Sequence, residues 1–147
     1  MGIITVGGVL KKDNKYLLVQ EAKAEFRGTW NLPAGRMDPN ETVLDGAKRE
    51  IREECGYSVN LTGIAEIRND TIFGEPFIGI VFSTEIIDQV SEYNKDEILD
   101  IKWFNYDEIL EMRGQLRYPD AIINSITTVE NNATSDINLI KIQEASQ

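Results

Sequence analysis

Residues 35–57 read GRMDPNETVLDGAKREIREECGY, and this stretch carries the strongest structural signal in the chain. Its periodicity predicts a helix over residues 42–55. In such a helix Glu50, Glu53 and Glu54 stand at positions i, i+3 and i+4, so their carboxylates share one face. Like charges at these spacings repel one another, and a hard divalent cation with oxygen ligands is one reason to tolerate them. A solvated acidic helix surface is the alternative.

The predicted helix has a recognisable start and a buried side. Thr42 can cap it, with Asp45 at the third helical position, although a start at Asp38 is also compatible with the sequence. Gly46 falls on the acidic side, where it either leaves room for metal and substrate or is a tolerated helix glycine. The apolar stripe beside the acidic face consists of Val43, Leu44, Ala47, Ile51 and Cys55.

The same stretch resembles the Nudix box, the signature of the Nudix (MutT-type) hydrolases. The fixed positions of that signature are met by Gly35, Glu41, Arg49, Glu50, Ile51, Glu53, Glu54 and Gly56. Tyr57 departs from it, since the family more often has Ile, Leu or Val there, and residues 30–34 (WNLPA) resemble the family's lead-in. The resemblance implies an α/β/α sandwich around a mixed β-sheet. We expect one Nudix domain over residues 1–147.

Composition limits the classes of protein that fit. A chain of 147 residues with 41% hydrophobic content suits one globular domain. A formal charge of -10 argues against binding to duplex nucleic acid, which depends on Lys and Arg. There is no histidine and only one cysteine, so zinc and an internal disulfide are not expected. No apolar run is long enough to span a membrane and no secretory signal is present, which predicts a cytoplasmic protein.

The remaining sequence alternates between strand-like and helix-like segments. We expect a hairpin of two antiparallel strands joined by polar residues 11–15, then a loop at residues 21–29. Residues 131–147 are expected to form a flexible tail, an added strand or a partner contact. The predicted strands are residues 3–9, 16–19, 30–32, 59–68, 77–87 and 101–104, and further helices are predicted at 106–112 and 119–129.

By resemblance to the family, the catalytic and metal-binding residues cluster in the box. Glu50, Glu53 and Glu54 would bind Mg²⁺, for which Mn²⁺ could substitute, and the carbonyl of Ala34 would be an additional ligand. Arg49 is expected to hold Glu41 or Glu50 by a charge-assisted hydrogen bond. An ordinary helix ion pair is the alternative role for Arg49.

The general base is either a box glutamate or an acid from a later loop. Glu97 is our loop candidate, with Asp96 and Glu92 as competitors, and a solvated loop carboxylate is the alternative. Arg36, beside the box glycine, is the favoured phosphate contact. Lys23 and Arg27 are the weaker phosphate candidates, and the aromatic residues available to stack on a base are Phe73, Phe77, Trp103 and Tyr118.

Three functions are compatible with these residues. The first is a Mg²⁺-dependent pyrophosphohydrolase acting on nucleoside diphosphates or triphosphates, including oxidised guanine forms such as 8-oxo-dGTP. The subgroup that removes such nucleotides is suggested by Leu116-Arg117 and Pro119-Asp120 together with residues 30–37. The second is hydrolysis of ADP-ribose or a nucleotide sugar. The third is a Nudix module that senses a nucleotide without cleaving it, and a monomer and a homodimer both fit the sequence.

Overall fold

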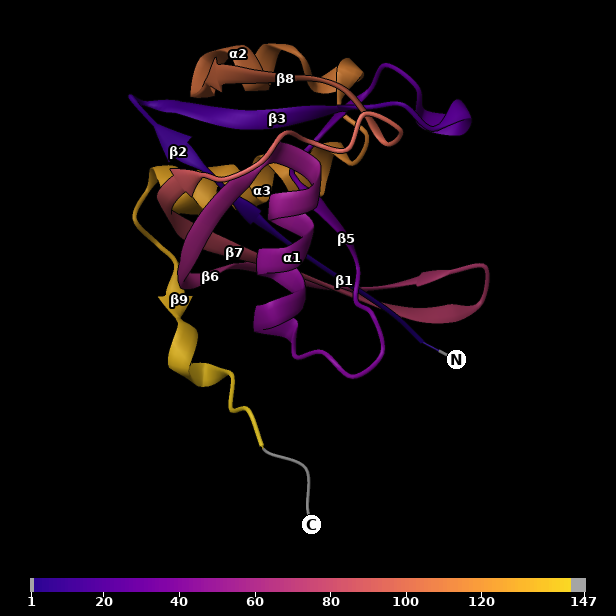
Figure 1. Ribbon diagram of the computed structural model, residues 1–147, viewed down its shortest axis with the longest axis vertical. Coiled ribbons are helices and arrows are strands. Elements are labelled where there is room, and N and C mark those ends of the chain that lie inside the picture. The colour runs from indigo at the N-terminus through magenta and orange to yellow at the C-terminus, as the bar shows by residue number, and fades with distance from the viewer. Residues whose placement is uncertain (1, 144–147) are drawn as a thin grey trace.

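The computed structural model describes residues 2–143, and its strands form two sheets flanked by helices (Figure 1). The elements are β1 (Ile3–Val9), β2 (Lys11–Lys12), β3 (Lys15–Glu21), η1 (Ala24–Phe26), β4 (Trp30–Asn31), β5 (Ala34–Arg36), α1 (Val43–Cys55), β6 (Tyr57–Ile72), β7 (Glu75–Gln89), β8 (Ile98–Asn105), α2 (Tyr106–Glu111), η2 (Arg113–Gln115), α3 (Pro119–Glu130), β9 (Ser135–Asp136) and η3 (Ile137–Leu139). The larger sheet has the order β5-β1-β7-β6-β9. It is mixed, because β1 runs parallel to β7 while its other neighbours are antiparallel. The smaller sheet joins β2, β3, β4 and β8.

Helices cover both faces of this β-structure. On one side Ala47 of α1 packs with Val6 and Phe82 of the larger sheet. On the other side Ile109 of α2 and Ile126 of α3 belong to one buried cluster with the inward residues of β3. The expected α/β/α sandwich around a mixed sheet is therefore confirmed. Within residues 2–143, the structure contains no helix long and apolar enough to span a membrane.

Helix α1 begins and ends where its local sequence signals predict. The side chain of Thr42 accepts a hydrogen bond from the backbone N–H of Asp45 at 3.1 Å, which caps the first turn. Gly56 ends the helix with φ of 80°, and a side chain there would collide with the carbonyl of Ser91. Gly46 has a different role from the one expected. A Cβ at Gly46 would stand 2.9 Å from Oε1 of Glu41, so the glycine makes room for that carboxylate.

The expected hairpin between residues 3–9 and 16–19 is wrong. Strand β1 pairs with β5 and β7, whereas β3 pairs with β2, β4 and β8 in the other sheet. The hairpin in this region is β2–β3, which turns at Asp13 and Asn14 with φ of 52° and 60°. Positive φ at both central residues matches the twist of the strands that a two-residue turn joins.

Residues 69–76 are more ordered than we expected, and the C-terminal segment forms one of the alternatives that we left open, an added strand. Residues 69–76, expected to separate two strands, form most of the outer part of the long β6–β7 hairpin, which turns at Phe73 and Gly74. Cross-strand pairing here outweighs the weak strand preference of Asn69 and Asp70. In the C-terminal segment β9 adds a strand beside Gly63 and Ile64 of β6. Residues 144–147 of the expected tail lie outside the described residues.

Candidate active site

Arg49 is the centre of the ionic network on α1. Its Nη2 lies 2.7 Å from Oε1 of Glu41, and its Nη1 lies 2.9 Å from Glu50 and 3.1 Å from Glu53. Nη2 also donates to the backbone carbonyl of Arg36 at 3.1 Å. The hydrogen bonds from Arg49 lower the pKa of Glu41 to about 2. One guanidinium therefore ties three box carboxylates to strand β5, which fits the positioning role expected of Arg49.

Two box carboxylates are buried against the backbone of β5. The N–H of Ala34 donates to Oε1 of Glu54 at 2.9 Å. A Cβ at Gly35 would collide with the carboxylate of Glu50, so only glycine allows this close approach. Burial raises the pKa of Glu54 to about 9 and also raises the pKa of Glu50, since water no longer stabilises the charged forms.

A third buried carboxylate, Glu21, lies outside the box. Its Oε1 accepts from Nδ2 of Asn31 at 3.3 Å and forms an ion pair with Nη1 of Arg117 at 3.2 Å. The guanidinium of Arg117 lies 3.9 Å above the ring centre of Phe26. The charge of Glu21 contributes to the raised pKa of Glu54, which places the two carboxylates in one electrostatic cluster.

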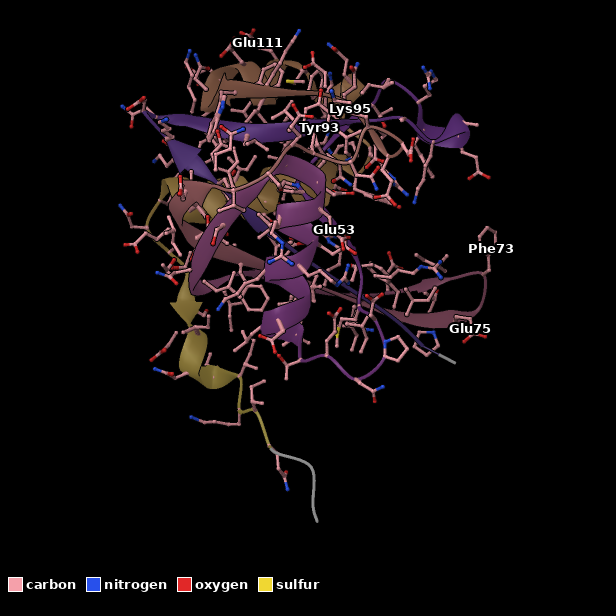
Figure 2. All side chains as sticks on the ribbon, viewed as in Figure 1. Glu53, Phe73, Glu75, Tyr93, Lys95 and Glu111 are labelled. Atoms are coloured by element: carbon pink, nitrogen blue, oxygen red, sulfur yellow. The ribbon has the colours of Figure 1, made fainter. Side chains whose placement is uncertain are left out.

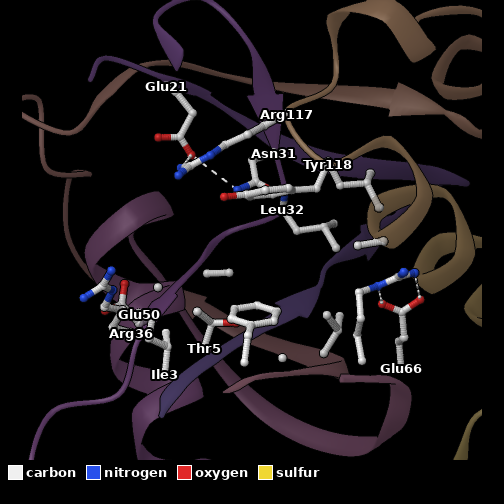
Figure 3. Close-up of a pocket in the computed structure, with 18 of the residues that line it drawn as sticks. Ile3, Thr5, Glu21, Asn31, Leu32, Arg36, Glu50, Glu66, Arg117 and Tyr118 are labelled. Atoms are coloured by element: carbon white, nitrogen blue, oxygen red, sulfur yellow. Dashed lines mark hydrogen bonds and ion pairs between the residues drawn. The ribbon is translucent and has the colours of Figure 1, made fainter. Parts of the chain in front are cut away.

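The three buried carboxylates, Glu21, Glu50 and Glu54, line a cavity of about 790 Å³. Figure 3 shows Glu50 and Arg36 on one side of it, Glu66 on the other, and Leu32 and Thr5 between them. Clefts of this size suit small-molecule ligands of the dimensions of a nucleotide. The acidic residues that line it are Glu21, Asp38, Glu50, Glu54, Glu66, Asp70, Glu97 and Asp120, and the basic residues are Lys23, Arg36, Arg68 and Arg117.

The later loop brings Glu97 to this cavity. Its charge contributes to the raised pKa values of Glu50 and Glu54. The backbone carbonyl of Glu97 accepts from the N–H of Ala22 at 2.9 Å, which anchors the loop beside β3. The competing residue Glu92 instead pairs with Lys95 at 3.6 Å and does not line the cavity. Asp96 does not line it either.

The cavity includes some of the predicted substrate contacts and excludes others. Arg36 and Lys23 line it, as do Phe77 and Tyr118. Arg27 does not line it, and its Nη1 donates to the carbonyl of Ala22 at 3.1 Å. Two predicted aromatic contacts lie elsewhere, since Phe73 is exposed at the tip of the β6–β7 hairpin (Figure 2) and Trp103 packs edge-on against Tyr57.

The donor set suits a hard cation, although the side chains do not enclose one as they stand. Within residues 2–143 no three acidic side chains are close enough to hold a metal ion. Glu53 lies on the exposed side of α1 (Figure 2), where it pairs with Arg49 rather than lining the cavity. Burial and neighbouring carboxylates nevertheless raise the pKa of both Glu50 and Glu54, so a nearby cation would stabilise their charged forms. Oxygen ligands with excess negative charge are those preferred by Mg²⁺ and similar ions.

Sequence reasoning missed the cavity residues that come from distant segments. Asn31 belongs to the lead-in, but only the fold brings it to Glu21 and Arg117. Glu21 could have been found from the sequence, because it is a charged residue at the end of the apolar segment that forms β3. The Glu66–Arg68 pair on β6 was also missed. Polar and apolar residues alternate along that strand, which indicates that one of its faces does not belong to the hydrophobic core.

Comparison with known proteins identifies the family of this fold and site. The sequence profile described as the NUDIX domain matches residues 2–123. The chain therefore belongs to the NUDIX domain family, whose members generally need divalent metal cations. A solved structure, the NUDIX hydrolase from Nitrosomonas europaea, superimposes with a TM-score of 0.85 at 26% identity and covers 99% of this chain and 100% of that one.

Two curated relatives carry phosphatase names. The 8-oxo-dGDP phosphatase NUDT18 of Mus musculus is 36% identical over 98 residues, which cover 65% of this chain and 29% of the relative. Phosphatase NudJ of Escherichia coli is 29% identical over 118 residues, which cover 79% of this chain and 76% of that protein. The match to NUDT18 thus spans less than a third of that relative's length.

Proposed function

We propose that this protein is a metal-dependent hydrolase that cleaves a phosphoanhydride bond in a nucleoside diphosphate or triphosphate. The observation that carries the proposal is the meeting of Glu50 and Glu54 with the backbone of Ala34 and Gly35 in the wall of one large cavity. Family membership supports it independently. The carboxylates required for metal binding are intact, which favours an enzyme over a module that only senses nucleotides.

The box residues would divide the work between holding a cation and positioning its ligands. Glu50, Glu53 and Glu54, with the carbonyl of Ala34, would hold Mg²⁺ or, as a substitute, Mn²⁺. When bound, such an ion neutralises phosphate charge and lowers the pKa of water. Arg49 fixes Glu50, and its contact with Glu53 is on the exposed side of α1, so Glu53 can turn toward the cavity without repacking the core.

The cavity residues suggest how the substrate is bound and attacked. Arg36 and Lys23 lie where they can contact non-bridging phosphate oxygens. Water attacks phosphorus and forms a new P–O bond while the P–O bond of the anhydride breaks. The leaving phosphate or pyrophosphate departs with the bridging oxygen, and a proton of the water passes to the carboxylate of Glu97. The nucleoside then occupies the rest of the cavity, between β1, β7 and the start of α3.

The relatives' names narrow the substrate that we propose. NUDT18 is named for 8-oxo-dGDP, so guanine nucleotides, the oxidised forms included, are the first candidates for this chain. We also propose that the protein works in the cytoplasm, as one domain, in the form of a monomer or a homodimer.

A panel of nucleotides tests this function directly. The protein is incubated with Mg²⁺ and (d)NTPs, (d)NDPs, 8-oxo-dGTP, 8-oxo-dGDP, ADP-ribose and nucleotide sugars, and products are separated by chromatography. We expect a nucleoside monophosphate from the nucleotides and no turnover with EDTA. The matched control is Glu54→Gln, which keeps the size of the side chain but removes the carboxylate that would bind the cation. Equal turnover by Glu54→Gln, or turnover in EDTA, would contradict the proposal.

A further inference from the structure

Two rows of paired residues connect the box to a charged pair on β6. Ala34 pairs with Gly7, Gly7 with Val81, and Val81 with Glu66. The second row runs beside it from Arg36 through Thr5 and Gly79 to Arg68. Neighbouring strands lie about 4.8 Å apart, so three steps place Glu66 and Arg68 roughly 14 Å from the box edge. An extended nucleotide can bridge these two ends.

The floor between the two ends is made of small side chains. Gly7, Thr5, Gly79 and Val81 lie in the middle of the rows, and Phe77 is on the same face of β7. A Cβ at Gly79 would stand 3.1 Å from Oγ1 of Thr5 and 3.3 Å from the Phe77 ring. Gly79 therefore makes room for the Phe77 ring, and this ring gives the floor of the cavity an apolar face on which a flat group can stack.

Glu66 fixes the orientation of Arg68 at the far end of the cavity. The Nε of Arg68 donates to Oε1 of Glu66 at 2.9 Å, and its Nη2 donates to Oε2 at 2.8 Å. This bidentate pairing uses one edge of the guanidinium. The other edge, formed by Nη1 and the second N–H of Nη2, has no hydrogen-bond partner within residues 2–143. It presents two donors side by side.

The charges around Arg68 indicate what this edge can bind. Two side-by-side donors fit a group with two adjacent acceptors, such as a phosphate, a carboxylate or the O6 and N7 atoms of guanine. Glu66 pairs with Arg68, and Asp70 adds negative charge that also raises the pKa of Arg68, while Asp120 is itself paired with Arg113. An anionic ligand would be repelled here. A neutral group with two acceptors is therefore favoured, and the phosphates belong at the other end of the cavity.

We propose that Arg68, oriented by Glu66, is a base-reading residue that binds the O6 and N7 edge of a guanine. Adenine offers an acceptor at N7 but a donor at its N6 amino group, so it satisfies only one of the two N–H groups. In 8-oxoguanine N7 carries a proton, which leaves O6 as the acceptor on this edge. This inference rests on the proposed function, because the phosphates orient the base toward β6.

The test compares guanine with adenine in the variant Arg68→Lys. Lysine keeps the charge and the ion pair with Glu66 but lacks the two-donor edge. Calorimetry gives Kd for GMP and AMP, and kinetics give kcat/KM for dGTP, dATP and 8-oxo-dGTP, all with Mg²⁺. The matched control is Arg52→Lys on the exposed side of α1. Thermal unfolding verifies that each variant folds.

We expect wild-type protein to prefer GMP, and Arg68→Lys to lower the guanine-to-adenine ratio by about tenfold or more. The loss should be larger for dGTP than for 8-oxo-dGTP, and Arg52→Lys should leave all ratios unchanged. Equal effects on GMP and AMP, or no preference in the wild type, would overturn the proposal. If Arg68→Lys does not fold, the neutral double variant Glu66→Gln with Arg68→Gln must show the same decrease in the guanine-to-adenine ratio.

Binding and turnover separate this inference from the proposed function. Preferential GMP binding that depends on Arg68, in a protein without hydrolytic activity, would support the base-reading role and reject the enzyme. Hydrolysis with no base preference would support the enzyme and reject the base-reading role of Arg68.

Discussion

The carboxylate of Glu41 accepts hydrogen bonds from both Nε and Nη2 of Arg49, the shortest from each at 3.0 Å and 2.7 Å. Gly46 leaves the space in which this carboxylate lies. Because Nε and Nη2 are held in this way, Nη1 is free to contact Glu50 and Glu53. Glu41 thus acts on the proposed metal ligands through Arg49.

Replacing Arg49 should therefore disturb the ligands without changing the donor set. We expect Arg49→Gln to lower kcat by about 10- to 100-fold, the usual effect of losing a group that orients metal ligands. Arg52→Gln, at the exposed position on the next turn, is the matched control and should stay near wild type. Unchanged kcat in Arg49→Gln would show that the ion pairs of Arg49 are ordinary helix contacts.

The box carboxylates should be needed for turnover but not for folding. Glu53→Gln and Glu54→Gln are each expected to reduce kcat by about 100-fold or more, because a weaker cation stabilises the transition state less. In Glu54→Gln the amide oxygen can still accept the hydrogen bond from the N–H of Ala34. Circular dichroism should therefore show a native helix content. Near-normal rates in both variants would place the metal site elsewhere.

Glu97 is tested by the pair Glu97→Gln and Glu92→Gln. If the loop carboxylate takes the proton from water, Glu97→Gln should reduce kcat with little change in KM. Glu92→Gln removes an exposed carboxylate from the same loop and should be silent. A silent Glu97→Gln combined with a nearly inactive Glu50→Gln would assign the base to α1.

Arg36 should recognise the outer phosphates. Arg36→Ala is expected to raise KM more for a triphosphate than for its diphosphate, since the shorter substrate lacks some of the oxygens that a guanidinium would bind. Arg27→Ala is the control, because Arg27 does not line the cavity. The same change in KM for both substrates would remove Arg36 from phosphate binding.

Tyr16 should make the protein sensitive to alkaline pH. Its hydroxyl donates to Glu130 at 2.6 Å, and burial together with Glu130 raises its pKa. A raised pKa contributes stability at pH values below the ordinary tyrosine pKa, and this contribution is lost as the pH rises above that value. Denaturant unfolding should therefore show a steeper alkaline loss of stability in wild type than in Tyr16→Phe. Parallel pH curves would refute this assignment.

The sequence predicts those parts of the fold that depend on local signals. Thr42 and Gly56 mark the ends of α1, and Pro119 begins α3 as expected. The partners of β1 could not be predicted, because Thr5 pairs with Arg36 on one side and Gly79 on the other, across long stretches of chain. Strand pairing between distant segments leaves little trace in a single sequence.

The same distinction applies to the site. The box motif locates Glu50, Glu53 and Glu54, because their spacing on a helix is local. The sequence could not show whether Glu53 lines the cavity, because its side chain can also pair with Arg49, as it does in the structure. The ion pair between Glu21 and Arg117 joins residues from the two halves of the chain, so composition and periodicity could not reveal it.

The paired rows across the larger sheet have an evolutionary consequence. Strands β1 and β7 separate the box edge at Ala34 and Arg36 from the far edge at Glu66 and Arg68. Effects of substitutions that far apart are usually additive. Mutation at the far edge can therefore change which nucleotide is accepted while the chemistry at the box is preserved. After gene duplication, descendants of such a protein could diverge in substrate one residue at a time without passing through inactive intermediates.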